Sequence, residues 1–142
     1  MTQKENGKYK NKPRGQSLIE FALTLPILLL LVIGAMDFGR MFYIKVVTTN
    51  AAREGVNYLA YFPDDAQNGY AETLEAIINE AESSNVEVVA SEVTFTNCCT
   101  PGQAVGVTIT KTTDLIFGSF LQSLGLINGP LQLTSTARMV VQ

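Results

Sequence analysis

Residues 21–36 read FALTLPILLLLVIGAM, a run of sixteen residues without a charge. As an α-helix this run would be roughly 24 Å long at about 1.5 Å per residue. The hydrocarbon core of a bilayer is about 30 Å thick. Apolar residues continue beyond Glu20 on one side of the run and beyond Asp37 on the other, although both acids interrupt it. The run therefore predicts a transmembrane helix over residues 16–37.

The charges on either side of the run differ in sign. Residues 1–15 carry five basic side chains and one acidic one, a net charge of +4, whereas residues 16–142 carry five basic and twelve acidic ones, a net charge of −7. A basic flank beside an apolar span marks the cytoplasmic side of a membrane; a solvated or nucleic-acid-binding arm is the alternative. We predict a cytoplasmic leader at 1–15, an extracytoplasmic domain at 38–142 and no nucleic-acid partner.

A buried core helix and a secretory signal peptide are the competing interpretations of the apolar run. A core helix would not explain why a basic segment adjoins it. A signal peptide would end in an A-x-A-like cleavage site, whereas residues 34–38 read GAMDF. The run therefore favours a retained, single-pass span in the cytoplasmic membrane, with lipid as its partner.

Two residues of the span, Glu20 and Pro26, are unusual for a simple anchor. A carboxylate at the centre of a bilayer costs about 2.5–3.5 kcal/mol on insertion scales, and less near the edge. Glu20 therefore either reaches interfacial water or has a specific partner. Pro26 removes a backbone donor and tends to kink a helix. It is either a simple kink or a flexible point that loosens when the helix moves from lipid into an assembly.

A motif typical of proteolytic processing precedes Glu20. Residues 12–21 read KPRGQSLIEF, so a basic leader ends in Gly15 and the acid is the fifth residue after that glycine. This resembles the processing site of type IV prepilins, which a membrane peptidase cuts after the glycine. Residues 15–26 (GQSLIEFALTLP) and 50–55 (NAAREG) resemble the TadE-like family, pilin-like minor subunits of tight-adherence (Flp-type) pilus systems, and residues 133–139 (LTSTARM) are similar to its closing strand.

The resemblance implies cleavage between Gly15 and Gln16. Gln16 would then acquire a free amine, which has an ordinary pKa of about 8. Glu20 lies roughly one helical turn away, so the two charges can neutralise each other within a chain or between subunits. In a packed helix core this pairing would remove the penalty on the carboxylate. The implied partners are a prepilin peptidase, other pilin-like subunits and the pilus assembly machinery.

Helical spacing continues beyond the span. Apolar residues recur at intervals of three, four and seven as far as Leu59, with a gap near Lys45, and the next proline is Pro63. We therefore predict one helix over about residues 17–61. The small residues at positions 51, 52 and 55 would let a sheet or a neighbouring helix approach closely.

The remaining segments predict an α+β fold. Residues 70–84 have the spacing of an amphipathic helix, which Asp64 or Asp65 can cap, and residues 115–126 are a short helix or a buried loop. Alternating, β-rich segments at 86–96, 104–113 and 131–141 predict three antiparallel strands. A long helix on such a sheet, with one short extra helix, matches the type IV pilin-like plan that the resemblance implies.

Cys98 and Cys99 are adjacent in the predicted turn between the first two strands. On the predicted topology they lie outside the membrane, where oxidation is possible. A disulfide between these neighbours, an intersubunit disulfide and free thiols are all compatible with the sequence. Their spacing gives no zinc framework.

No pattern in the chain indicates an enzyme. There is no His, the commonest general base and metal ligand, and no nucleophile elbow, metal constellation or phosphate loop. We predict no cofactor, no metal and no small-molecule substrate. The resemblance implies a pilin-like membrane subunit that is built into, or primes, an extracellular pilus of the tight-adherence type, with a role in surface adhesion or secretion. The alternative is a permanently anchored envelope protein with an exported binding domain.

Overall fold

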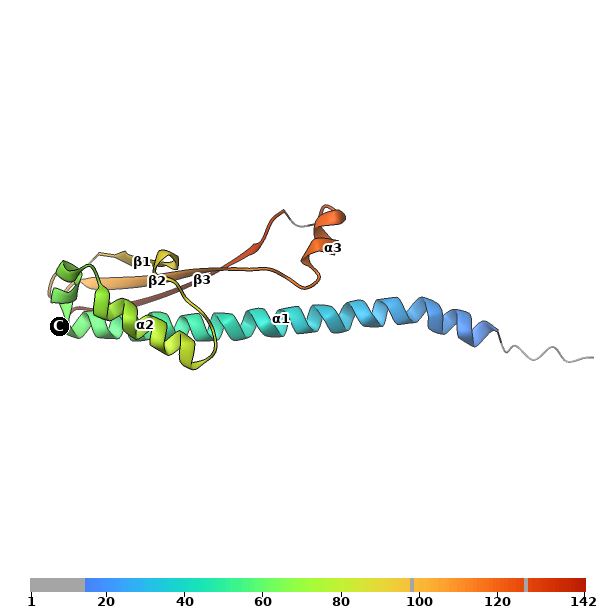
Figure 1. The fold of residues 1–142 in the computed structure, drawn as a ribbon, viewed down its shortest axis with the longest axis horizontal. Helices are drawn as coiled ribbons and strands as arrows, with labels where there is room; N and C mark the ends of the chain where they lie inside the picture. Colours follow the sequence, from blue (N-terminus) through green and yellow to red (C-terminus); the bar gives the residue numbers. More distant parts are fainter. Residues whose placement is uncertain (1–14, 98, 127) are drawn as a thin grey trace, which may run out of the picture.

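A computed structural model describes residues 15–97, 99–126 and 128–142. Its longest element is α1 (Gln16–Tyr61), a helix of 46 residues, which corresponds to about 69 Å at 1.5 Å per residue. Figure 1 shows that α1 extends well beyond the rest of the fold on its N-terminal side. The single long helix predicted over about residues 17–61 is confirmed.

The other elements follow α1 in the chain, and most of them lie along its C-terminal half (Figure 1). They are the 3-10 helix η1 (Pro63–Asn68), α2 (Ala71–Ser83), the 3-10 helix η2 (Ala90–Glu92), β1 (Val93–Thr96), β2 (Ala104–Thr113), α3 (Gly118–Ser123) and β3 (Leu131–Val140). The strands form one antiparallel sheet in the order β1-β2-β3. The predicted α+β fold, with three antiparallel strands on a long helix, is confirmed.

The hydrophobic core lies where α1 meets both α2 and the sheet. Side chains at helical spacing on α1 face alternate side chains of β2 and one face of α2, because helices and strands present residues with periods of 3.6 and 2. Each fully buried aliphatic side chain contributes about 1.5–3 kcal/mol. The core includes Val47, Ala51, Ala52, Val56 and Leu59 of α1, Ile77 and Ala81 of α2, and Val105, Val107 and Ile109 of β2.

Gly55 marks the closest approach between α1 and its neighbours. A Cβ added there would lie 2.5 Å from both Cγ1 and Cδ1 of Ile77 on α2, and 3.7 Å from Cγ1 of Val107 on β2. A sheet and a second helix thus meet α1 at the same residue. This confirms that small residues at 51, 52 and 55 permit close packing.

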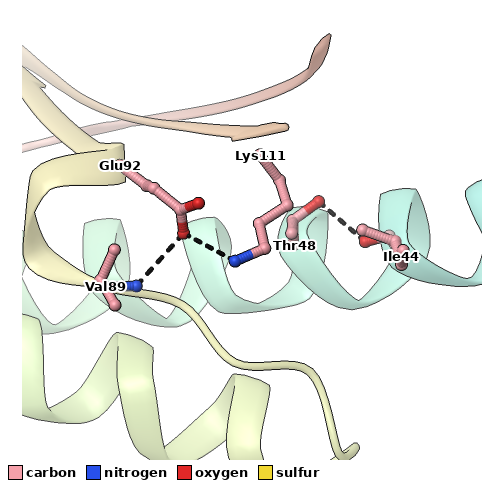
Figure 2. Close-up of polar contacts among 5 residues, drawn as sticks. All are labelled: Ile44, Thr48, Val89, Glu92 and Lys111. Atoms are coloured by element: carbon pink, nitrogen blue, oxygen red, sulfur yellow. Dashed lines mark hydrogen bonds and ion pairs between the residues drawn. The ribbon is translucent and has the colours of Figure 1, made fainter. Parts of the chain in front are cut away.

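The strand predicted over residues 86–96 is wrong in its first half. Only Val93–Thr96 pairs with β2, because η2 turns the chain before Val93. Figure 2 shows Glu92 holding this turn: its Oε2 accepts the Val89 N–H at 3.2 Å and lies 3.0 Å from Nζ of Lys111 on β2. Val86 and Val88 are buried without pairing in the sheet. Their alternation therefore reflects contact with the core along an extended connection.

Polar contacts explain the gap in the apolar pattern near Lys45. The Lys45 ammonium donates to the carbonyl of Thr134 on β3. One turn later, Thr48 Oγ1 donates to the Ile44 carbonyl at 2.9 Å (Figure 2) and lies 2.8 Å from Ser135 Oγ. Thr48 and Ser135 are both fully buried. Polar residues therefore join α1 to β3 at the gap in the apolar pattern.

Asp65 joins the end of α1 to the start of α2. Its carboxylate accepts the Thr73 N–H at 2.9 Å, the Glu72 N–H at 3.3 Å and the Thr73 hydroxyl. The predicted capping role thus belongs to Asp65, seven to eight residues before the N–H groups it satisfies. Burial acts to raise the pKa of Asp65, but the hydrogen bonds from Thr73 and Glu72 outweigh it and hold the pKa below its ordinary value.

Replacing Asp65 with Asn is expected to lower the free energy of unfolding at neutral pH by about 1–3 kcal/mol, because a buried charge-assisted cap is lost. The depressed pKa makes this contribution fully present above the ordinary value of 3.8. It disappears as the pH falls through the folded-state pKa. Unfolding of the full chain in detergent, followed by near-ultraviolet circular dichroism, should show variant and wild type converging in acid. Asp64→Asn is the control, because Asp64 is exposed, and it should change the free energy of unfolding little. A loss of stability equal to that of Asp65→Asn would contradict the capping role of Asp65.

Candidate functional site

The predicted processing site lies at the start of α1. Gly15 is exposed and directly precedes the helix, and its carbonyl accepts the Ile19 N–H at 3.2 Å. A Cβ at Gly15 would have no atom within 4 Å. Gln16 is the first helical residue and is also exposed. Residues 1–14 of the predicted leader (1–15) lie outside the described residues, so the division into leader, span and extracytoplasmic domain stays a prediction.

Glu20 lies one helical turn after Gln16, as the spacing predicts. The Gln16 side-chain Nε2 donates to Glu20 Oε1 at 3.1 Å. The Thr24 hydroxyl donates to the backbone carbonyl of Glu20 at 2.7 Å. Among residues 15–97, 99–126 and 128–142, the only ion pair joins Lys111 to Glu92. The Glu20 carboxylate is thus exposed on the helix surface, in contact with a neutral amide from the adjacent turn.

The first part of α1 exposes apolar side chains all around the helix. The large ones from Leu18 to Met36 contact little else in the fold, and Leu23 and Leu31 are 69% and 65% exposed. Within the described residues, α1 is the one helix long and apolar enough to cross a membrane. Pro26 lies inside this part, and Figure 1 shows the helix axis bending in the blue, N-terminal third of α1. The helix continues through the proline.

Asp37 has a role that the sequence did not reveal. Its side chain is only 5% exposed. Its two carboxylate oxygens accept the backbone N–H groups of Ile116 and Phe117, at 2.9 and 3.0 Å. In the sequence Asp37 only interrupts an apolar run, and its partners lie about 80 residues away. The one available signal was that an acid follows the apolar run, at a distance from Gln16 close to the thickness of a bilayer core.

Cys99 lies away from this end of α1. Cys99 is half-buried against the core and takes part in a disulfide, while Cys98 lies outside the described residues. The nearby turn is fixed by a hydrogen bond from the Gly102 N–H to the Val141 carbonyl at 3.0 Å. The Gln142 N–H in turn donates to the Ala60 carbonyl at 3.2 Å, which places this turn at the C-terminal end of α1. The pairing of the cysteines stays a prediction.

No polar cluster of catalytic type joins these residues. Arg53, Glu54 and Arg138 line a shallow groove between α1 and β3. In the described part of the chain, no group of three or more His, Cys, Asp or Glu is placed to hold a metal ion.

Comparison with known proteins finds a match in the same part of the chain. Residues 15–57 match a family model described as TadE-like protein. The matched range begins at Gly15 and ends within α1, so it contains Glu20, Pro26 and Asp37. No curated protein and no solved structure matches the chain.

Proposed function

We propose, from the TadE-like match that confirms the resemblance over residues 15–57, that this chain is a pilin-like membrane subunit of a tight-adherence pilus. The observation that carries the proposal is the N-terminal part of α1. It is apolar on every side, it begins at a glycine of the prepilin type, and Glu20 lies one turn inside it. A family of pilus subunits also favours a structural role over an enzymatic one.

The proposed sequence of events starts with α1 in the cytoplasmic membrane, the leader inside and the folded domain outside. A prepilin peptidase then cuts after Gly15. The cut removes the +4 leader, which otherwise holds the N-terminus in the cytoplasm, and it frees the amine of Gln16. The Gln16 side-chain amide already lies 3.1 Å from Glu20 Oε1, so the two residues share one face of the helix, which supports a pairing of the new amine with that carboxylate. The span then packs among other subunits in a surface pilus.

Cleavage after Gly15 is the first test of this function. Full-length chain is produced in cells with an active prepilin peptidase, and its mass is measured intact. The expected product begins at Gln16. Gly15→Leu should leave the chain uncut, because a bulky residue replaces the glycine of the motif, whereas Gly7→Leu in the leader is a matched control that should be cut.

A wild-type chain that still begins at Met1 in those cells would contradict the proposal. That result would favour a permanently anchored envelope protein with an exported binding domain. Cells with an inactive peptidase separate processing from other proteolysis, since a Gln16 start there would implicate a different protease.

A further inference from the structure

Residues 115–126, which include α3, expose apolar side chains in a protein domain expected to lie in water. From Leu115 to Ala137 the sequence holds no charged residue. Exposed large apolar side chains gathered in one segment mark an interaction surface. The most exposed are Ile116 (64%), Phe120 (47%), Leu124 (56%) and Leu126 (68%).

The fold fixes the level of this segment along α1. Asp37 binds the N–H groups of Ile116 and Phe117, so the start of the segment is held against that residue. Asp37 lies 21 positions after Gln16, or roughly 32 Å along the helix axis. A bilayer core is about 30 Å thick. The segment therefore lies at the outer boundary of the membrane when α1 spans it.

Figure 1 shows the same relation without reference to a membrane. The loop carrying α3 extends from the sheet toward the N-terminal half of α1, beyond the ends of β2 and β3. It is the part of the C-terminal domain that reaches furthest toward the apolar span. On α1 beside Asp37, Met36 and Phe38 are 63% and 67% exposed, so the apolar surface of the span reaches the level of the loop.

We propose that residues 115–126 insert into the outer leaflet of the bilayer that α1 spans, as a second, interfacial anchor. Apolar side chains of this kind enter about 5–10 Å into the boundary between headgroups and acyl chains. The absence of charge removes the main penalty for that position. The inference rests on α1 being a membrane span, as in the proposed function, and is independent of the pilus.

The same arrangement gives the burial of Asp37 a physical reason. A carboxylate at the membrane boundary that lacks partners would have to reach water or bear a desolvation cost. Here both of its oxygens are satisfied by backbone N–H groups of the loop. The loop thus covers the acid, and the acid holds the loop at the membrane surface.

Tryptophan fluorescence can measure the depth of the loop, because the chain has no Trp. We would place single tryptophans in the full chain by Phe120→Trp in the loop, Leu29→Trp in the span and Tyr61→Trp at the outer end of α1. Each variant is reconstituted as one copy per phosphatidylcholine nanodisc, with and without bromine on the acyl chains. Phe120→Trp should be quenched by brominated lipid nearly as strongly as Leu29→Trp, and several-fold more than Tyr61→Trp.

The outcomes separate lipid from protein contacts. Quenching of Leu29→Trp with none at Phe120→Trp would overturn the inference while leaving the span intact. Lack of quenching at both positions would contradict the span itself. A further outcome is that the Trp of Phe120→Trp is shielded from water only when a disc holds several copies. That result would show that the loop contacts a second copy of the chain, and it would also overturn the inference.

Asp37→Asn provides a second measurement in the Phe120→Trp background. Asn retains a single acceptor oxygen, and its amide group opposes the other N–H. The loop should then leave its position, and quenching by brominated lipid should fall toward the Tyr61→Trp level. Unchanged quenching would show that Asp37 does not hold the loop at the membrane.

Discussion

Replacing Glu20 with Ala is expected to leave the chain in the membrane and processed, but to prevent its incorporation into filaments. Insertion depends on the apolar residues around Glu20, which are unchanged, and removing an acid from a span eases it. In the assembly the Gln16 amine would then be buried without its partner. Breaking a buried ion pair by removing one member costs about 3–5 kcal/mol, which corresponds to on the order of 100-fold or more in incorporation.

The measurement compares membrane and sheared-filament fractions by immunoblot. Glu20→Gln should fail almost as completely, because it keeps the shape of the side chain but not its charge. Glu75→Ala removes an exposed acid from α2 and should assemble normally. Filaments of Glu20→Ala at wild-type levels would show that the charge pair is unnecessary.

Replacing Gly55 with Leu is expected to unfold the C-terminal domain or greatly reduce its stability. The first added carbon would already lie 2.5 Å from two atoms of Ile77, which is fully buried. Overpacking typically costs about 1–3 kcal/mol and occasionally more, and we expect the upper end here because Leu adds four carbons. Replacing a helical glycine returns only about 1 kcal/mol. The net loss is a large fraction of the roughly 5–15 kcal/mol that stabilises a typical domain.

Gly39→Leu, on the same helix, is the matched control. A Cβ added at Gly39 would have no neighbouring atom within 4 Å beyond the adjacent backbone of the helix itself. It should be neutral or slightly stabilising. Thermal unfolding of the full chain in detergent, followed by near-ultraviolet circular dichroism, compares the two variants. If Gly55→Leu matched Gly39→Leu in its melting temperature, the contact of α1 with α2 would not be the tight point of the fold.

The elements with strong local patterns were predicted closely. The strands predicted at 104–113 and 131–141 correspond to Ala104–Thr113 and Leu131–Val140, and the helix predicted at 70–84 to Ala71–Ser83. In these segments the apolar residues repeat with the period of the helix or strand that forms, because one face of that element is buried. Residues 86–92 have the same alternation yet form no strand, since an extended chain packed on a core also alternates. Periodicity records which side chains are buried, and pairing depends on a neighbour that is distant in sequence.

The sequence by itself determined the apolar span, its basic flank, the glycine of the processing motif and the spacing of Glu20. All of these are local, so residues within a few positions of each other carry the information. Only the tertiary structure decided that Asp37 binds the loop near α3, and that this loop lies level with the end of the span. Those contacts join residues about 80 positions apart, and no local pattern records a partner brought in by the folding of the intervening chain.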